Sequence, residues 1–178
     1  MPASAFKFLR HLWLDASDAE RKVGKAVLER IAQRVAASEQ RHSGEIRFCI
    51  EASLPLSYLW RVSRERPLTA VIRERAVMMF SKLGVWDTEA NNGVLIYVLL
   101  AEHAIEIVAD RGLNGVISSE RWAQVVGHLG QAFKDGRHED GLTQALEEIS
   151  ALLMEHFAVS PGSTSPNPNE LPDTPAVL

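Results

Sequence analysis

The chain has 178 residues, of which 46% are hydrophobic, and its formal net charge is -4 at neutral pH. This length and apolar content suffice for one sizeable buried core, so we expect a single soluble domain. The acidic balance offers no broad attraction to phosphate backbones, which argues against nucleic acid as a partner. The single cysteine, Cys49, lies in an apolar strand pattern and cannot form an intramolecular disulfide, which fits a reducing compartment.

Residues 1–15 are predicted to form an N-terminal arm. Lys7, Arg10 and His11 interrupt its apolar run, and no small-residue cleavage site follows, so the pattern is not that of a secretory signal. A short amphipathic helix over 6–14 would pack on the domain or, alternatively, dock to a partner or a membrane surface. Because no window reaches the roughly 18 uninterrupted apolar residues of a spanning helix, we expect a cytoplasmic protein without a transmembrane segment.

Hydrophobic periodicity predicts a helix, a strand and a second helix in the first half of the chain. Ser17 and Glu20 fit a capping box, and apolar residues at helical spacing then continue to a stop at Gly44. The next segment, 45–53, alternates apolar and polar side chains and is predicted to be a strand. On its polar face Arg47 and Glu51 are each expected to meet a partner from another element or solvent. An irregular crossover then leads to a second helix; the crossover covers 54–67 and the helix 68–83.

A hairpin is predicted for the middle of the chain. Residues 94–101 are almost continuously apolar, which indicates a central strand covered on both faces. A second strand, 104–109, follows after Glu102 and His103, so an antiparallel pairing is the natural connection. These two residues are not the favoured turn residues, which leaves room for a wider turn. His103 is expected to be a solvated turn residue.

Folding this hairpin predicts one candidate site, at the end opposite Glu102. The pairing places Asp110 and Arg111 beside Asn91 and Asn92, next to the polar loop 85–93. Asp87, Glu89 and Asn91 begin like a calcium loop, but the later positions of an EF-hand do not match. The candidate metal ligands are Asp87, Asn91 and Asp110, and the candidate ligand-binding residues are Trp86, Asn92 and Arg111.

Two further helices and a tail complete the predicted domain. Ser118 or Ser119 caps a third helix, and a fourth helix ends near Phe157. Residues 158–178 hold five of the eight prolines and are predicted to be disordered. The domain thus spans 16–157. Its element order predicts an α/β fold of the Rossmann-like α/β/α sandwich type, with helices on both faces of a small mixed β-sheet.

Four segments resemble the TPM domain family, namely HSGEIRF at 42–48, VWDTEANNGVLIYVLL at 85–100, EIVADRGL at 106–113 and FKDGRHEDGL at 133–142. The resemblance covers about residues 20–157 and implies a Rossmann-like sandwich. Members of this family include acid phosphatases, calcium-binding proteins and accessory factors that assemble or repair membrane complexes. Many members carry a secretion signal, a membrane segment and a glycine-rich tail, and this chain is expected to be a cytoplasmic member without them. Glu102-His103 and Asp110-Arg111-Gly112 also depart from the usual family residues.

One function that these residues suggest is a divalent-metal site. Carboxylate and amide oxygens suit Ca²⁺ or Mg²⁺, and no organic cofactor is expected. With Arg111 as a phosphate ligand, such a site would permit weak metal-assisted hydrolysis of phosphomonoesters, as in an acid phosphatase. However, no nucleophile is evident, and Ser118 and Ser119 fit helix caps better. An ion pair between Asp110 and Arg111 that closes the turn is the favoured structural interpretation.

The other function is a non-enzymatic interaction or accessory module, and this is the interpretation that we favour. The chain would hold a protein partner or a membrane-associated complex through the same cleft, the arm around Trp13, or the loop aromatics Trp60 and Trp86. The sequence contains neither a recognisable pair of nucleophile and base nor a strong ligand set.

Overall fold

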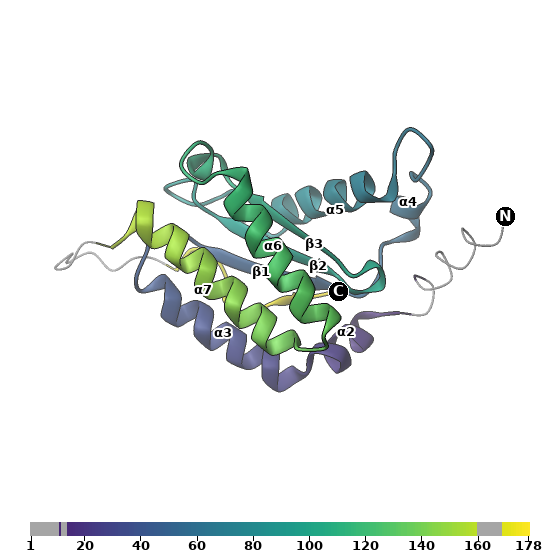
Figure 1. Ribbon diagram of the computed structural model, residues 1–178, viewed down its shortest axis with the longest axis horizontal. Helices are drawn as coiled ribbons and strands as arrows, with labels where there is room; N and C mark the ends of the chain where they lie inside the picture. The colour runs from purple at the N-terminus through teal and green to yellow at the C-terminus, as the bar shows by residue number, and fades with distance from the viewer. Residues whose placement is uncertain (1–10, 12–13, 160–168) are drawn as a thin grey trace.

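A four-stranded mixed sheet, in the order β3-β2-β1-β4, is the centre of the molecule (Figure 1). The computed structural model describes residues 11, 14–159 and 169–178. One face of the sheet is covered by α4 (Leu56–Leu59) and α5 (Leu68–Lys82). The other face is covered by four helices, α2 (Ala16–Val23), α3 (Lys25–Glu39), α6 (Ser119–Lys134) and α7 (His138–Phe157). The predicted α/β/α sandwich is confirmed.

The pairing of the strands follows their apolar patterns. β1 (Ile46–Glu51) pairs in parallel with β2 (Val94–Leu99), which pairs antiparallel with β3 (Ala104–Ala109). Every residue of β2 is buried, so the predicted central strand is confirmed. In β1, Phe48 faces the core under α3 and α7, whereas Cys49 faces α5, as the alternation predicts.

The first helix begins earlier than predicted and is interrupted. Asp15 is its N-cap, and its carboxylate accepts hydrogen bonds from the amides of Ser17 and Asp18, while the Asp18 carboxylate accepts one from the Asp15 amide. The predicted capping box at Ser17 and Glu20 is therefore wrong, because a carboxylate two residues upstream satisfies the free amides. At Gly24, where φ is +96°, the chain breaks the predicted single helix into α2 and α3.

The described part of the N-terminal arm packs on the domain. His11 is buried, its Nδ1 accepts a hydrogen bond from the Leu54 amide at 3.0 Å, and its Nε2 lies 3.0 Å from Glu102 Oε1. Nε2 therefore carries the proton and donates to the Glu102 carboxylate. The hairpin turn is the wider kind, with a 3₁₀ turn η1 (Leu100–Glu102) and an exposed, left-handed His103. Most of the predicted helix over 6–14 lies outside the described residues.

The end of the chain corrects one prediction. Residues 169–178 run along β1, and β4 (Ala176–Val177) pairs with it in parallel, so the disorder predicted for 158–178 is wrong for this part. Residues 160–168 lie outside the described residues. Glu45 accepts hydrogen bonds from the amides of Glu170 and Leu171, and Arg47 donates to the carbonyls of Pro172 and Thr174. The tail pairs because it supplies backbone partners to the edge of β1 and to these two buried charged side chains, and because Leu171 is buried against the sheet.

Both charged residues on the polar face of β1 meet partners from other elements, as predicted. The Glu51 carboxylate accepts hydrogen bonds from Nε and Nη2 of Arg75, at 2.9 and 2.5 Å, and from the hydroxyl of Tyr97 at 2.5 Å. All three residues are buried where α5, which carries Arg75, packs on the sheet. The network is closed to solvent and stabilises the packing of α5 on the sheet. Across the described ranges, no helix has the length and apolar content needed to cross a membrane.

Candidate functional site

The loop that leads into β2 and the turn that follows β3 meet at one end of the sheet (Figure 1). Asp110 donates its amide to the Gly93 carbonyl at 2.9 Å, and Gly112 donates to the Asn91 carbonyl at 2.8 Å. A Cβ at Gly112 would lie 2.5 Å from the Asn91 oxygen, so only glycine permits this approach. The predicted placement of Asp110 and Arg111 beside Asn91 is confirmed, but the register is shifted, because Ala109 rather than Arg111 pairs with Val94.

The side chains at this end are arranged differently from the expected ion pair. Asp110 is the N-cap of η2 (Arg111–Leu113), and its Oδ1 accepts the Arg111 amide at 2.7 Å. The Arg111 guanidinium turns to Asn91 instead, with Nε 2.8 Å from Oδ1. Among the described residues no ion pair joins the Asp110 and Arg111 side chains. The predicted ion pair is therefore wrong, because a backbone amide holds the carboxylate and an amide oxygen holds the guanidinium.

Two side-chain oxygens at this end are buried and have no hydrogen-bond partner among the described residues. They are Oδ2 of Asp110 and Oδ1 of Asn92. Asn92 is fully buried and is oriented by its other groups, since its amide donates to Thr88 Oγ1 and its Nδ2 donates to Ser43 Oγ, each at 3.1 Å. A buried oxygen without a donor or a cation costs free energy. Both oxygens therefore suit a cation.

Trp86 and Asp87, in the loop before these residues, are exposed. Trp86 is 54% exposed, and its indole Nε1 donates to the Ser81 carbonyl at 3.3 Å. Asp87 is exposed, and its carboxylate makes no hydrogen bond or ion pair with another described residue. In the described part of the chain no group of three His, Cys, Asp or Glu side chains could hold a metal ion. A cation at this end would therefore depend on amide oxygens, carbonyl oxygens and water beside Asp110.

Three residues that the sequence reasoning missed take part in this end of the sheet. Ser43 and Thr88 bind Asn92, and Glu170 of the tail accepts the Glu89 amide at 2.9 Å. Ser43 would have been found only by pairing the first strand with the second in parallel, because the register Ile46 to Val94 brings the two segments together. For Glu170 the sequence gives no signal.

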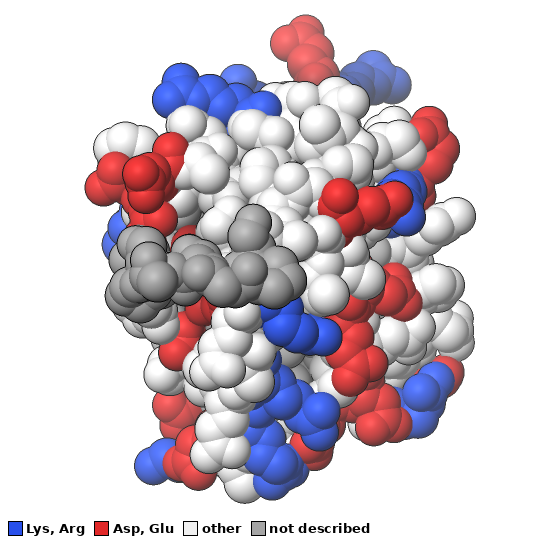
Figure 2. Space-filling model, turned by 90° about the vertical axis from the view of Figure 1, so that its left-hand side faces the viewer, with Lys and Arg blue, Asp and Glu red and all other residues white. Residues whose placement is uncertain are grey.

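The charges around this end are mixed. Figure 2 looks at this end of the molecule and shows Asp and Glu side chains interspersed with Lys and Arg. No broad surface of one sign appears in that view.

Among the described residues, Cys49, Ser119 and Ser150 all lack the surroundings of a nucleophile. Burial raises the pKa of the Cys49 thiol to about 12, which keeps it protonated. Ser119 is exposed at the start of α6, and its hydroxyl donates to Glu120. Ser150 Oγ does lie 3.1 Å from His42 Nε2, but both residues have no exposed surface and cannot meet a substrate.

Comparisons with known proteins agree on a family. A family model described as the TPM domain matches residues 18–152. The NMR structure of BA42 protein from Bizionia argentinensis is 25% identical, with a TM-score of 0.70 over 86% of this chain and 93% of that chain. The N-terminal domain of a P. gingivalis protein shares the fold at 17% identity, with a TM-score of 0.56 over 78% and 82%. No curated protein matches the chain. Because the family model covers most of the fold, including both strands of the hairpin, the chain belongs to the TPM domain family.

Proposed function

We propose that the chain is a non-enzymatic accessory module that binds a divalent cation at the Asn92 and Asp110 end of the sheet. The observation that carries the proposal is the pair of buried oxygens, Asp110 Oδ2 and Asn92 Oδ1, that lack a partner among the described residues. A carboxylate and an amide oxygen are ligands of hard cations.

Ca²⁺ suits this end better than Mg²⁺. Ca²⁺ accepts six to eight oxygens in flexible geometry, including neutral amide and carbonyl oxygens, whereas Mg²⁺ demands a near-ideal octahedron. Asp110 and Asn92 would hold the ion, and the exposed Asp87 would complete the set together with water. Asn91 is a weaker candidate than Asn92, because its Oδ1 already accepts the Arg111 guanidinium. A bound ion would supply charge to orient an acidic group of a partner.

The accessory role rests on the exposed aromatic side chain next to this end. Trp86 is more than half exposed, and an exposed aromatic ring is a common anchor for a protein partner. Trp60 is more exposed still, at 81%, but it follows α4 whereas Trp86 follows α5. The 15-residue α5 separates them by about 22 Å at 1.5 Å per residue, so they cannot form one anchor. We therefore place the partner surface at Trp86.

The test is a titration of Ca²⁺ and Mg²⁺ followed by calorimetry and by thermal unfolding. At a free ion concentration of about 100 times Kd, one native-state site adds about 2.7 kcal/mol to the free energy of unfolding. For a chain of this size we expect Tm to rise by about 5–10 °C. Asp110→Asn should abolish most of that rise, and Glu65→Gln, which removes an exposed carboxylate in the loop before α5, should leave it unchanged.

A rise in Tm that Asp110→Asn leaves intact would contradict the proposed site. The hydrolysis of p-nitrophenyl phosphate, measured on the same proteins, tests the proposal that the module has no enzymatic activity. If the chain hydrolyses this substrate, and the activity is lost in Asp110→Asn but kept in Glu65→Gln, the function is that of a phosphatase and not of an accessory module.

A further inference from the structure

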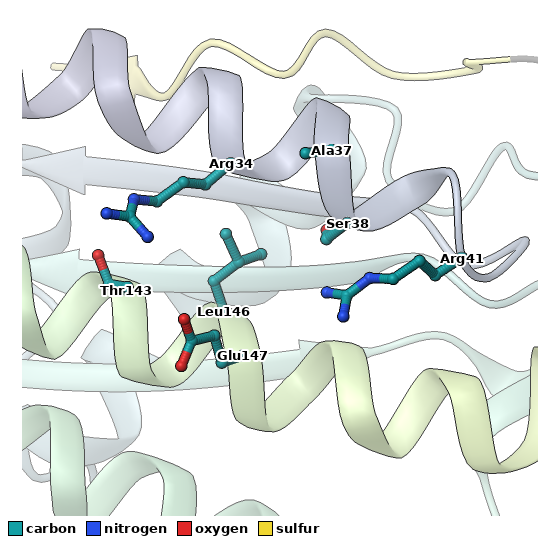
Figure 3. A pocket seen from close by; sticks show the side chains of 7 residues that line it. All are labelled: Arg34, Ala37, Ser38, Arg41, Thr143, Leu146 and Glu147. Atoms are coloured by element: carbon teal, nitrogen blue, oxygen red, sulfur yellow. The ribbon is translucent and has the colours of Figure 1, made fainter.

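A groove between α3 and α7 is distinct from the hairpin end. Its volume is about 270 Å³, which is below the size of most drug-like sites and suits a small molecule. Figure 3 shows Arg34 and Arg41 toward its two ends, with Leu146 between them. One wall comes from the end of α3 and the other from α7, and the lining residues are Arg34, Ala37, Ser38, Arg41, Thr143, Leu146 and Glu147.

Arg41 is oriented by a chain of hydrogen bonds that leads from the groove into the buried interior. Its Nη2 donates to Ser150 Oγ at 3.0 Å, and Ser150 Oγ lies 3.1 Å from His42 Nε2. His42 Nδ1 lies 2.9 Å from the Gly44 carbonyl, which can only accept, so Nδ1 carries the proton. Burial lowers the pKa of His42 to about 4, and the neutral ring accepts the Ser150 proton at Nε2. The Ser150 oxygen is thereby turned toward the Arg41 guanidinium.

The groove carries positive charge that no described carboxylate neutralises by direct contact. Neither Arg34 nor Arg41 forms an ion pair with a described residue, whereas the neighbouring Arg30 binds Glu139 through both Nε and Nη2. The lining holds two arginines and one glutamate, a balance of +1. In addition, Thr143 Oγ1 is buried and has no hydrogen-bond partner among the described residues. A hydroxyl in this state can donate to a ligand oxygen.

We propose that this groove binds a small organic molecule with an anionic group at each end and a hydroxyl group between them. Arg34, with the Thr143 hydroxyl, takes one anionic group, and the oriented Arg41 takes the other. Glu147 lies between the two arginines in Figure 3 and accepts the ligand hydroxyl. Its negative charge repels a third anionic group at this position. The apolar floor at Leu146 and Ala37 fits the carbon chain. The site does not depend on a cation at the hairpin end.

The test is an NMR titration of the full chain in chelator, with 3-phosphoglycerate as the probe. Glycerol 3-phosphate, which lacks the carboxylate, is the matched comparison. We expect saturable shifts confined to the end of α3 and to α7, and binding of glycerol 3-phosphate about tenfold weaker, as for a lost charged hydrogen bond. Equal affinity for both molecules, or no saturation up to about 20 mM, would overturn the proposal.

Four variants separate binding from folding. Arg34→Gln should weaken 3-phosphoglycerate about tenfold, and Thr143→Val should weaken it while keeping the shape of the side chain. Glu147→Gln should tighten it about threefold, because one repulsive charge is removed. Arg64→Gln removes an exposed arginine in the loop before α5 and should change nothing. If Arg64→Gln lowers the affinity as much as Arg34→Gln does, the attraction is non-specific and the site is refuted.

Discussion

The tail should control the affinity of the hairpin end for Ca²⁺, and Glu170→Ala tests this. Glu170 is exposed, and its Oε2 accepts the Glu89 amide at 2.9 Å, within the loop that carries Asp87 and Asn91. A hydrogen bond to a charged group contributes about 1.5–3 kcal/mol, and exposure to solvent reduces this to about 1 kcal/mol. If that bond fixes the loop for the ion, its loss raises the Ca²⁺ Kd about fivefold.

The assay is calorimetric titration of Ca²⁺ together with hydrogen exchange of the Glu89 amide. Glu89→Gln is the matched control, because it removes one negative charge from the same loop and keeps the amide. We expect Glu170→Ala to weaken Ca²⁺ more than Glu89→Gln does, and to speed exchange of the Glu89 amide. Equal losses that both vanish in high salt would show only long-range attraction, and would refute the coupling. Unchanged exchange would refute the hydrogen bond itself.

Further variants test the packing and the buried charges. Arg75→Met leaves Glu51 buried and unpaired, so urea unfolding should show a loss of about 3–5 kcal/mol, and adding Glu51→Gln should recover part of it. Burial, with nearby carboxylates, raises the pKa of Glu39 from 4.5 to about 8, so the protonated form is favoured in the fold. The free energy of unfolding should therefore fall between about pH 4.5 and pH 8, and Glu39→Gln should flatten that fall, whereas an unchanged slope would contradict the assignment. Gly112→Ala should cost about 1–3 kcal/mol and weaken Ca²⁺ through overpacking. By contrast, Gly127→Ala, in open space on α6, should raise the free energy of unfolding by about 0.5–1 kcal/mol.

The sequence is sufficient for the sandwich and for the hairpin because both depend on local apolar periodicity. The run 94–101 has no polar residue that would have to face solvent, so it predicts a buried central strand. In the structure, β2 is buried throughout. The turn is wider than two residues, so Leu99 rather than Ala101 pairs with Ala104, but this shift along the strand still leaves Asp110 beside Asn91.

The remaining features depend on contacts between distant segments. The composition of 158–178 predicts disorder, but the apolar residues at its end, with Leu171, provide enough burial to pair with β1. Periodicity also cannot reveal that Asn92 is buried or that its oxygen lacks a donor, because that depends on Ser43 and Thr88. The groove between α3 and α7 is hidden for the same reason. Arg34 and Arg41 look like ordinary charges on a solvated surface until α7 is packed beside them.

The most direct test of the cation site is a crystal structure of the chain soaked in Ca²⁺, with the anomalous signal of the ion measured. The proposal predicts an ion about 2.3–2.6 Å from Asp110 Oδ2, with Asn92 Oδ1 among its ligands. Both oxygens would then be satisfied without a change in the backbone of β3. A crystal in which Ca²⁺ is absent from this end while a protein donor or an ordered water satisfies both oxygens would contradict the proposed function.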